Sequence, residues 1–254
     1  MAASQIGELA SFYYDDPLTL LTCTSLFAVV GEKEKASNTV KVILKCVNSR
    51  SSEIARGLKN LGYPREALTV LDGIDDSDNV LRIKAEASYA LGEAKEALSS
   101  VERLTERTLS DDILLADILC LLKDYDGALK IAEEVASESA DYESKKCLLN
   151  ILAASGDRKN ADRFVKNELK KNKDSPDANA LSAHLMWIEG KIAAAAAYAT
   201  KAIKIDTGHI GALETLAYCL IEKGELSRAQ IIAGAINEEA PGHPCVIKII
   251  DLCA

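Results

Sequence analysis

Prolines and aromatic residues are scarce in this chain of 254 residues, which has five prolines and an aromatic content of 5%. Ala, Leu, Glu and Lys, which favour helices, are abundant, whereas residues that favour strands are sparse. The most apolar stretch, 18–30, is too short to span a bilayer, and hydroxyl residues interrupt it. The N-terminus also lacks the basic start of a signal peptide. We therefore expect an all-α protein without a membrane anchor.

Sequence motifs of catalysis are missing as well. The chain has no Walker glycine loop, no GxGxxG and no GxSxG, and its three histidines (His184, His209 and His243) lie in different segments. The acidic pairs at 15–16, 75–76 and 111–112 each precede a predicted helix, where carboxylates cap free N–H groups. The sequence thus predicts no enzyme, no metal site and no cofactor.

The seven cysteines include no CxxC pair, and most lie in apolar runs, where a free thiol behaves as a small hydrophobic group. This usage favours a reducing compartment and a cytoplasmic location. The net charge of −9 and the pI near 5.0 repel phosphate backbones and anionic membranes. Nucleic acid is therefore a disfavoured partner.

A glycine followed five residues later by an alanine recurs along the chain. The pairs are Gly31/Ala36, Gly62/Ala67, Gly92/Ala97, Gly156/Ala161, Gly190/Ala195 and Gly224/Ala229, and Lys123/Ala128 occupies the same slot. The alanines are 30 to 34 residues apart. We expect each glycine to end a helix at positive φ, and each alanine to lie early in the next helix at a close helix crossing. This spacing predicts seven helical hairpins that stack on one another.

The predicted fold is a right-handed α-solenoid that forms a single domain over 1–254, with a C-terminal helix that caps the last hairpin. The expected hairpins cover 17–47, 48–77, 78–108, 109–141, 142–175, 176–209 and 210–242, and the cap covers 243–254. The chain resembles the tetratricopeptide repeat (TPR) family, most clearly over its last two hairpins. These carry Ala183, Gly190, Ala195, Ala202 and Asp206, then Leu213, Leu216, Ala217, Leu220, Gly224, Ala229 and Pro241.

The resemblance implies a binding role, because in this family the first helix of each hairpin lines a concave surface that holds another protein. The candidates on that surface are Arg56, Lys59, Arg82, Glu86, Tyr89, Asn150, His184, Trp187 and Tyr218. The same register also places Ser52, Asn60, Ile113, Asp117, Cys120, Lys146, Ala153, Ala180, Glu214 and Ile221 there. Trp187 and Tyr218 occupy related slots of adjacent hairpins, where they would either form an aromatic anchor or seal the core.

Chaperone-binding members of the family use Lys, Asn and Arg on successive first helices, and only Arg56, Lys59 and Asn60 resemble such a clamp. A separate basic segment contributes Arg158, Arg163, Lys166 and Lys170. It is interpreted either as a solvated outer helix or as a docking site for an acidic partner or RNA.

Segments 64–71 and 242–248 are similar to parts of the epsilon-subunit family of the coatomer (COPI) vesicle coat. That resemblance implies a permanent scaffold subunit in vesicle transport, bound to the coatomer alpha subunit and peripheral on Golgi or vesicle membranes. Two alternatives remain open: a transient adaptor for a short peptide, and a TPR subunit of a ribonucleoprotein such as the signal recognition particle. Self-association is left undecided.

Overall fold

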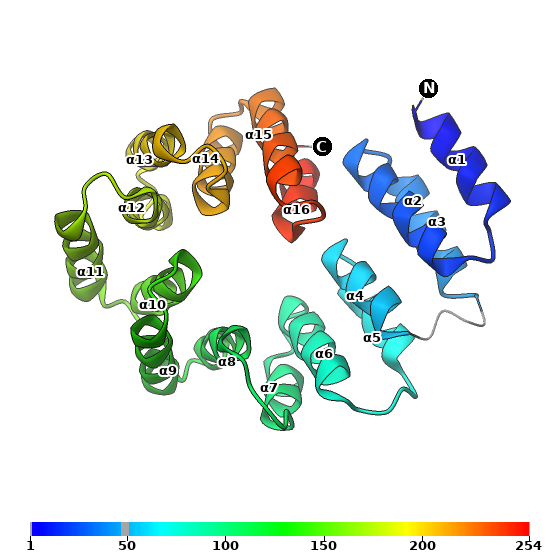
Figure 1. Ribbon diagram of the computed structural model, residues 1–254, viewed down its shortest axis with the longest axis horizontal. Coiled ribbons are helices and arrows are strands. Elements are labelled where there is room, and N and C mark those ends of the chain that lie inside the picture. The colour runs from blue at the N-terminus through cyan, green and yellow to red at the C-terminus, as the bar shows by residue number, and fades with distance from the viewer. Residues whose placement is uncertain (1, 47–50, 254) are drawn as a thin grey trace. The chain divides into compact units, whose positions relative to one another are not determined.

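A computed structural model describes residues 2–46 and 51–253 (Figure 1). Within these ranges the chain forms sixteen α-helices and no strand, so the predicted all-α solenoid is confirmed. Seven helical hairpins run from α2 to α15, with α1 before them and α16 after them. The predicted boundary between the first two hairpins, at 47–48, lies outside the described residues.

The helices belong to two compact units. The first unit comprises α1–α7 and α16, and the second comprises α8–α15. The helices of the first unit are α1 Ala2–Phe12, α2 Pro17–Val29, α3 Lys33–Ile43, α4 Ser52–Asn60, α5 Pro64–Leu71, α6 Asp78–Ala90, α7 Ala94–Glu102 and α16 Pro244–Leu252. Those of the second are α8 Leu109–Leu121, α9 Tyr125–Glu138, α10 Tyr142–Ala154, α11 Arg158–Lys171, α12 Pro176–Ile188, α13 Ile192–Ile205, α14 Ile210–Glu222 and α15 Leu226–Glu239. That 1–254 forms a single domain stays a prediction.

The first helix of every hairpin, called the inner helix below, begins at a side-chain cap. The capping residues are Asp16, Ser51, Ser77, Thr108, Asp141, Ser175 and His209. Each accepts a hydrogen bond from an N–H of the first turn, which otherwise has no partner in the helix. The predicted capping role holds for Asp16, and for Asp111 through a capping box with Thr108. It is wrong for Asp76, which instead pairs with Lys84 and Arg103, while Ser77 caps α6.

The turn inside each hairpin passes through the left-handed region of backbone space. All six predicted glycines have φ between 72° and 84°, and Lys123 adopts φ 64° in the remaining turn. A side chain with a Cβ is strained there by about 1–2 kcal/mol, whereas glycine is not. The glycine spacing in the sequence therefore identified these turns correctly.

The alanine that follows each turn is buried. Ala36, Ala67, Ala97, Ala128, Ala161, Ala195 and Ala229 are all 0–1% exposed, and each lies in the second helix of its hairpin. Larger apolar residues complete the core of each unit around them, such as Ile43 and Leu58 in the first unit and Leu149 and Leu181 in the second. A close helix crossing leaves room at these sites only for a methyl group.

The C-terminal helix α16 packs against α2, far away in the sequence but in the same unit. Lys33, at the start of α3, bridges this contact: its Nζ lies 3.1 Å from Oδ1 of Asp251 and donates to the backbone oxygen of the same residue. Cys245, Val246 and Ile249 of α16 are buried. The first hairpin is thus covered by α16.

We expect Ala195→Leu or Ala229→Leu to lower the free energy of unfolding by about 1–3 kcal/mol, because the added carbons must fit into a filled helix crossing. Ala197→Leu is the matched control, since Ala197 lies on the same helix α13 but is exposed. Urea denaturation of the three variants measures the effect. Equal stabilities for Ala195→Leu and Ala197→Leu would contradict the assigned register.

Replacing Lys123 by glycine should stabilise the chain by about 0.5–1 kcal/mol, because the relief of left-handed strain exceeds the extra freedom of glycine in the unfolded chain. The reciprocal change Gly156→Ala should destabilise it by about 1 kcal/mol. An added Cβ at Gly156 would meet no atom within 4 Å, so that loss would come from the backbone alone. Thermal unfolding of both variants checks that Lys123→Gly raises the melting temperature and Gly156→Ala lowers it.

Candidate functional site

The inner helices of the second unit lie side by side in the order α8, α10, α12 and α14, and each contacts the next. In Figure 1 they line the inner side of this unit, with the second helices of the hairpins outside them. Because the hairpins repeat every 33 or 34 residues here, equivalent positions of these helices come next to one another. The ninth positions are Asp117, Asn150, His184 and Tyr218.

Three rings form a ladder across α12 and α14. His184 and Trp187 are neighbours on α12, with ring centroids 6.1 Å apart and planes at 24°. Trp187 stacks in turn on Tyr218 of α14 at 5.3 Å and 26°. All three side chains are only partly buried, so their rings form part of the inner surface. The predicted proximity of Trp187 and Tyr218 is therefore present, and Trp187 is not sealed inside the core.

Asn150 of α10 holds the ladder at its histidine end. Its Oδ1 lies 2.6 Å from Nε2 of His184, so this nitrogen carries the proton and donates. Burial, and secondarily the positive charge of Lys146, lowers the pKa of His184 to about 4. The imidazole is consequently neutral at pH 7, which leaves Nδ1 as an acceptor.

A partly buried ion pair holds Tyr218, at the other end of the ring ladder, in place. Nζ of Lys146 on α10 lies 3.3 Å from Oε2 of Glu214 on α14, and the Tyr218 hydroxyl donates to Oε1 of Glu214 at 3.2 Å. Lys146, Ala180 and Glu214 are the fifth residues of α10, α12 and α14. Because the intervening Ala180 is fully buried and short, the two charged side chains meet across α12.

The environment of this ion pair raises the pKa of Lys146 and lowers the pKa of Glu214, so both partners are held in their charged forms. Neighbouring carboxylates, chiefly Glu214, raise the pKa of Lys146 against the opposing effect of burial. Lys146 in turn lowers the pKa of Glu214, which burial alone would raise. Nζ of Lys146 also lies 5.6 Å from the ring centroid of Tyr142, within cation–π range.

Asp117, the ninth residue of α8, has no ion-pair partner in the described part of the chain to compensate for its burial. Among the described residues it forms neither a hydrogen bond nor an ion pair. Burial raises the pKa of its carboxyl group to about 6, Lys146 lowers it less, and Glu143 adds to the rise. The inner face thus contains an acidic group that the fold leaves unpaired.

The two neighbouring thiols do not supply chemistry to this face. Burial, followed by the charge of Asp117, raises the pKa of Cys147 to about 12 and also raises that of Cys120. Both are therefore protonated at pH 7 and weak nucleophiles. All seven cysteines of the chain are free. Among the described residues, no group of three or more His, Cys, Asp or Glu side chains could hold a metal ion.

The remaining concave-face candidates lie in the first unit. Lys59 of α4 pairs with Glu86 of α6 at 2.5 Å, and Arg56 of α4 contacts Asn79 of α6. Arg82 donates to the backbone oxygen of Glu106 at 2.8 Å, and Tyr89 is partly buried on α6. The two basic residues of the predicted clamp are thus engaged with side chains of the neighbouring inner helix. They belong to a different unit from the ring ladder.

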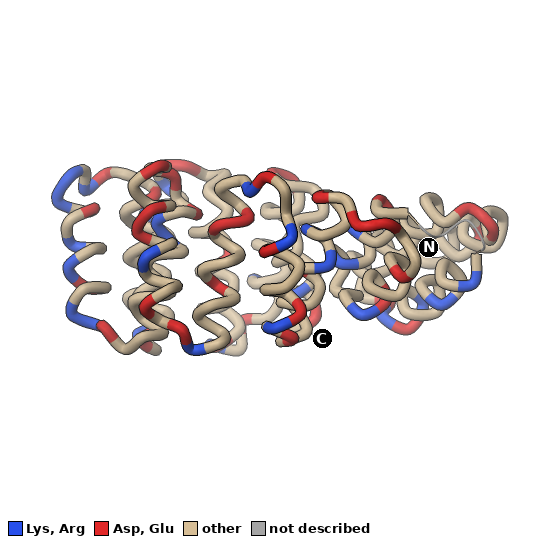
Figure 2. The backbone as a smooth tube through the Cα atoms, turned by 90° about the horizontal axis from the view of Figure 1, so that it is seen from below, with Lys and Arg blue, Asp and Glu red and all other residues tan. Residues whose placement is uncertain are grey.

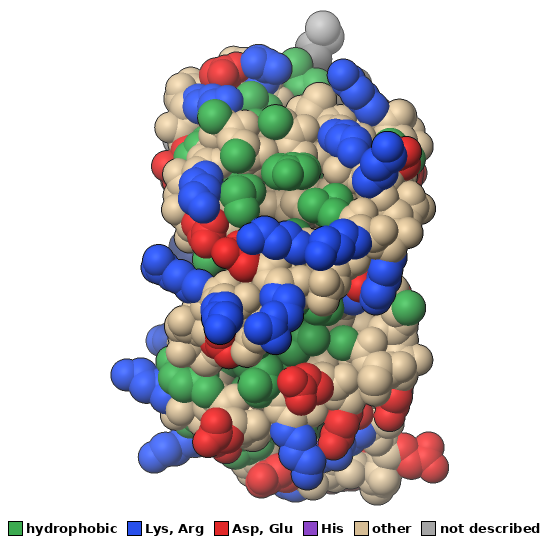
Figure 3. Space-filling view, turned by 90° about the vertical axis from the view of Figure 1, so that its left-hand side faces the viewer, with side chains coloured by type: hydrophobic (Ala, Val, Ile, Leu, Met, Phe, Trp, Pro, Cys, Tyr) green, Lys and Arg blue, Asp and Glu red, His purple; other side chains and the backbone are tan. Residues whose placement is uncertain are grey.

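The basic residues Arg158, Arg163, Lys166 and Lys170 lie on α11, an outer helix, and are exposed. Figure 2 shows Lys and Arg along α11, at the left of the view. Figure 3 shows this side of the molecule, where Lys and Arg side chains form a row with hydrophobic side chains above and below. Among the described residues none of the four forms an ion pair. Their use as a docking site stays a prediction.

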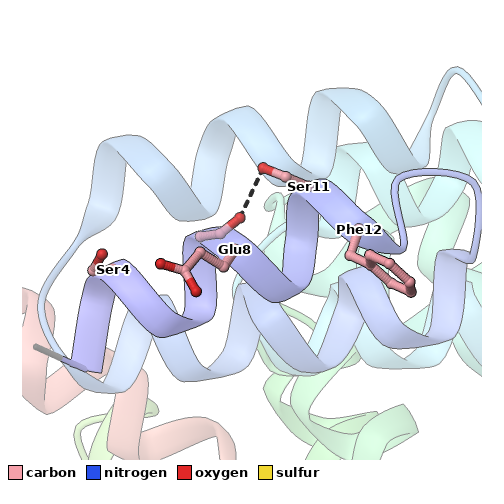
Figure 4. A pocket seen from close by; sticks show the side chains of 5 residues that line it. Ser4, Glu8, Ser11 and Phe12 are labelled. Carbon is pink, nitrogen blue, oxygen red and sulfur yellow. Dashed lines mark hydrogen bonds between the residues drawn. The ribbon is translucent and has the colours of Figure 1, made fainter.

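A shallow depression lies on the surface of α1 in the first unit. Figure 4 shows its lining side chains Ser4, Glu8, Ser11 and Phe12, which all come from α1, and Gly7 of the same helix completes the lining. Phe12 is 75% exposed. Glu8 is the only ionisable group of the lining, so this depression has no catalytic constellation. In the described residues no helix is both long and apolar enough to cross a membrane.

The comparisons with known proteins concern repeats and fold. Residues 186–246 match a family model described as Tetratricopeptide repeat. A tetratricopeptide repeat protein from Parabacteroides merdae superposes with a TM-score of 0.51 at 15% identity, covering 98% of this chain and 99% of that one. Yeast Tom70 superposes with a TM-score of 0.49 at 14% identity, covering 99% of this chain and 57% of that one. No curated protein matches the sequence significantly.

We expect Asp117→Asn to raise the free energy of unfolding at pH 8 by about 1–2 kcal/mol, because it removes a charge that the folded state leaves unpaired. The raised pKa means that the wild type loses stability as the pH rises from about 4 to about 6. The gain from the substitution should therefore shrink to nearly zero at pH 4. Urea denaturation across this pH range checks the trend, and a gain independent of pH would contradict the assigned environment.

Proposed function

We propose that this chain, whose residues 186–246 match a tetratricopeptide-repeat family model, is a non-enzymatic scaffold that binds another protein. The binding surface we propose is the inner face of the second unit, where α10, α12 and α14 present the ring ladder. The single observation that carries the proposal is the stacking of His184, Trp187 and Tyr218 on a surface that the chain itself leaves partly uncovered. An extended segment or a helix of a partner would lie across it.

The chemistry of the ladder supports this role. Tryptophan and tyrosine dominate the energy of protein interfaces because they bury large rigid surfaces and keep a polar tip for hydrogen bonding. The neutral imidazole of His184 adds apolar area without a charge that the partner would have to desolvate. Asn150 and Glu214 fix the two ends, so little conformational freedom is lost on binding.

We propose a permanent subunit of a multiprotein assembly rather than a transient adaptor. Support comes from apolar side chains exposed at α1 and the turn that follows it, including Phe12 at 75% and Tyr14 at 65%. Such exposure is typical of surfaces that stay covered in an assembly. A coatomer epsilon-like role with the alpha subunit as partner, a ribonucleoprotein role and a cytoplasmic location all stay predictions.

The proposal is tested by affinity isolation of the tagged full-length chain from its own cells, followed by mass spectrometry at low and high salt. Trp187→Ala should weaken partner capture roughly thirtyfold, equivalent to about 2 kcal/mol, because it removes the centre of the ladder. Tyr218→Ala tests the ladder independently. Ile231→Ala is the matched control, since it removes an exposed apolar side chain from the outer helix α15.

Stoichiometric, salt-resistant capture by the wild type and the control, with loss in both ladder variants at unchanged helicity, is the expected result. Weak and salt-sensitive capture would favour a transient adaptor. Undiminished capture by both ladder variants would show that the partner binds elsewhere on the chain.

A further inference from the structure

We propose that the segment held on this inner face is basic, and that an arginine or lysine side chain of the partner pairs with Asp117. This inference rests on the proposed function, because it concerns the same surface and specifies the chemistry of its occupant. It follows from the distribution of charge on the inner helices and from the way their own lysines are already engaged.

The inner helices of the second unit are strongly acidic. They contain seven carboxylates against two lysines: Asp111, Asp112, Asp117, Glu143, Asp177, Glu214 and Glu222 against Lys145 and Lys146. In the first unit the inner helices α2, α4 and α6 contain three carboxylates and four basic residues. The excess of negative charge therefore distinguishes the inner helices that carry the ladder.

Neither lysine forms an ion pair with Asp117. Lys145 is turned towards the outer helix α11, where its Nζ lies 2.8 Å from Oε2 of Glu168. Lys146 is held 3.3 Å from Glu214 and is also within 3.8 Å of Glu143. One cation is thus shared by two carboxylates, while Asp117 forms no ion pair among the described residues. A guest cation would supply the missing charge.

The surroundings of Asp117 suit a guanidinium or ammonium group. The next residues at the same register, Asn150 and His184, are uncharged at pH 7, so they do not repel a cation. The positive charge of Lys146 also acts on Asp117, but it is countered by Glu214 and Glu143. Trp187 and Tyr218 follow, and aromatic rings favour both the charge and the apolar stem of Arg and Lys. An acidic segment would instead meet a surface of its own sign.

Fluorescence anisotropy of the full-length chain with three short labelled peptides tests the inference. The peptides share leucine and alanine at their apolar positions and carry arginine, glutamine or glutamate at the others. We expect the arginine peptide to bind at least about tenfold more tightly than the glutamine peptide, and the glutamate peptide to bind most weakly. The preference should shrink at high salt, because exposed charges are screened.

Asp117→Asn should remove most of the arginine preference while raising the stability of the chain at pH 8, so weaker binding would not reflect unfolding. Asp126→Asn, which makes the same change of charge on the exposed face of the outer helix α9, should leave the preference intact. Equal binding of the three peptides, tighter binding of the glutamate peptide, or an undiminished preference in Asp117→Asn would overturn the inference.

The two proposals fail in different ways. If the ladder variants abolish capture of the natural partner and that partner's bound segment proves neutral or acidic, the scaffold proposal stands and the basic occupant is wrong. If the ladder variants change neither partner capture nor the binding of any peptide, the inner face is not the binding surface and both proposals fail.

Discussion

A close helix crossing in each hairpin is the constraint on which the rest of this structure depends. The two helices approach at an alanine that is almost fully buried, and a positive-φ residue just before it reverses the chain. Without the small side chain the helices would separate, and without the turn they would not be antiparallel. A hairpin of this size buries too little apolar surface to be stable alone, so its core is completed by a neighbouring hairpin of the same unit.

The candidate site follows from the regularity that the crossing imposes. Hairpins of nearly constant length place the fifth and ninth residues of α10, α12 and α14 next to their counterparts. Side chains distant in the sequence therefore form continuous rows, in which Lys146 reaches Glu214 over Ala180 and Asn150 meets His184. The stacked helices need only their buried faces for stability. The exposed rows are therefore free to differ between units, and the acidic inner face of the second unit is one such difference.

Much of this architecture could be predicted from the sequence, because glycine at fixed spacing indicates turns at positive φ and alanine indicates close helix crossings. The turn at Lys123 was found by register alone, although lysine is unfavourable there. The proximity of Trp187 and Tyr218 could also be predicted, because the two residues occupy related positions of adjacent hairpins. Side-chain pairing was not: the engagement of Lys146, the unpaired Asp117 and the ion pairs of Asp76 depend on side-chain packing across neighbouring helices. The contact of α16 with α2 lacked any local signal, because it joins residues more than 200 positions apart.

That contact has a consequence for how the chain is made. Lys33 and Asp251 are 218 positions apart, so at translation rates of about 5–20 residues per second α16 leaves the ribosome roughly 10–40 seconds after α2. During this interval the side of the first hairpin that α16 occupies in the finished protein has no cover of its own. A nascent chain of this design would thus depend on chaperones, or on slow folding of its first unit, until α16 has emerged.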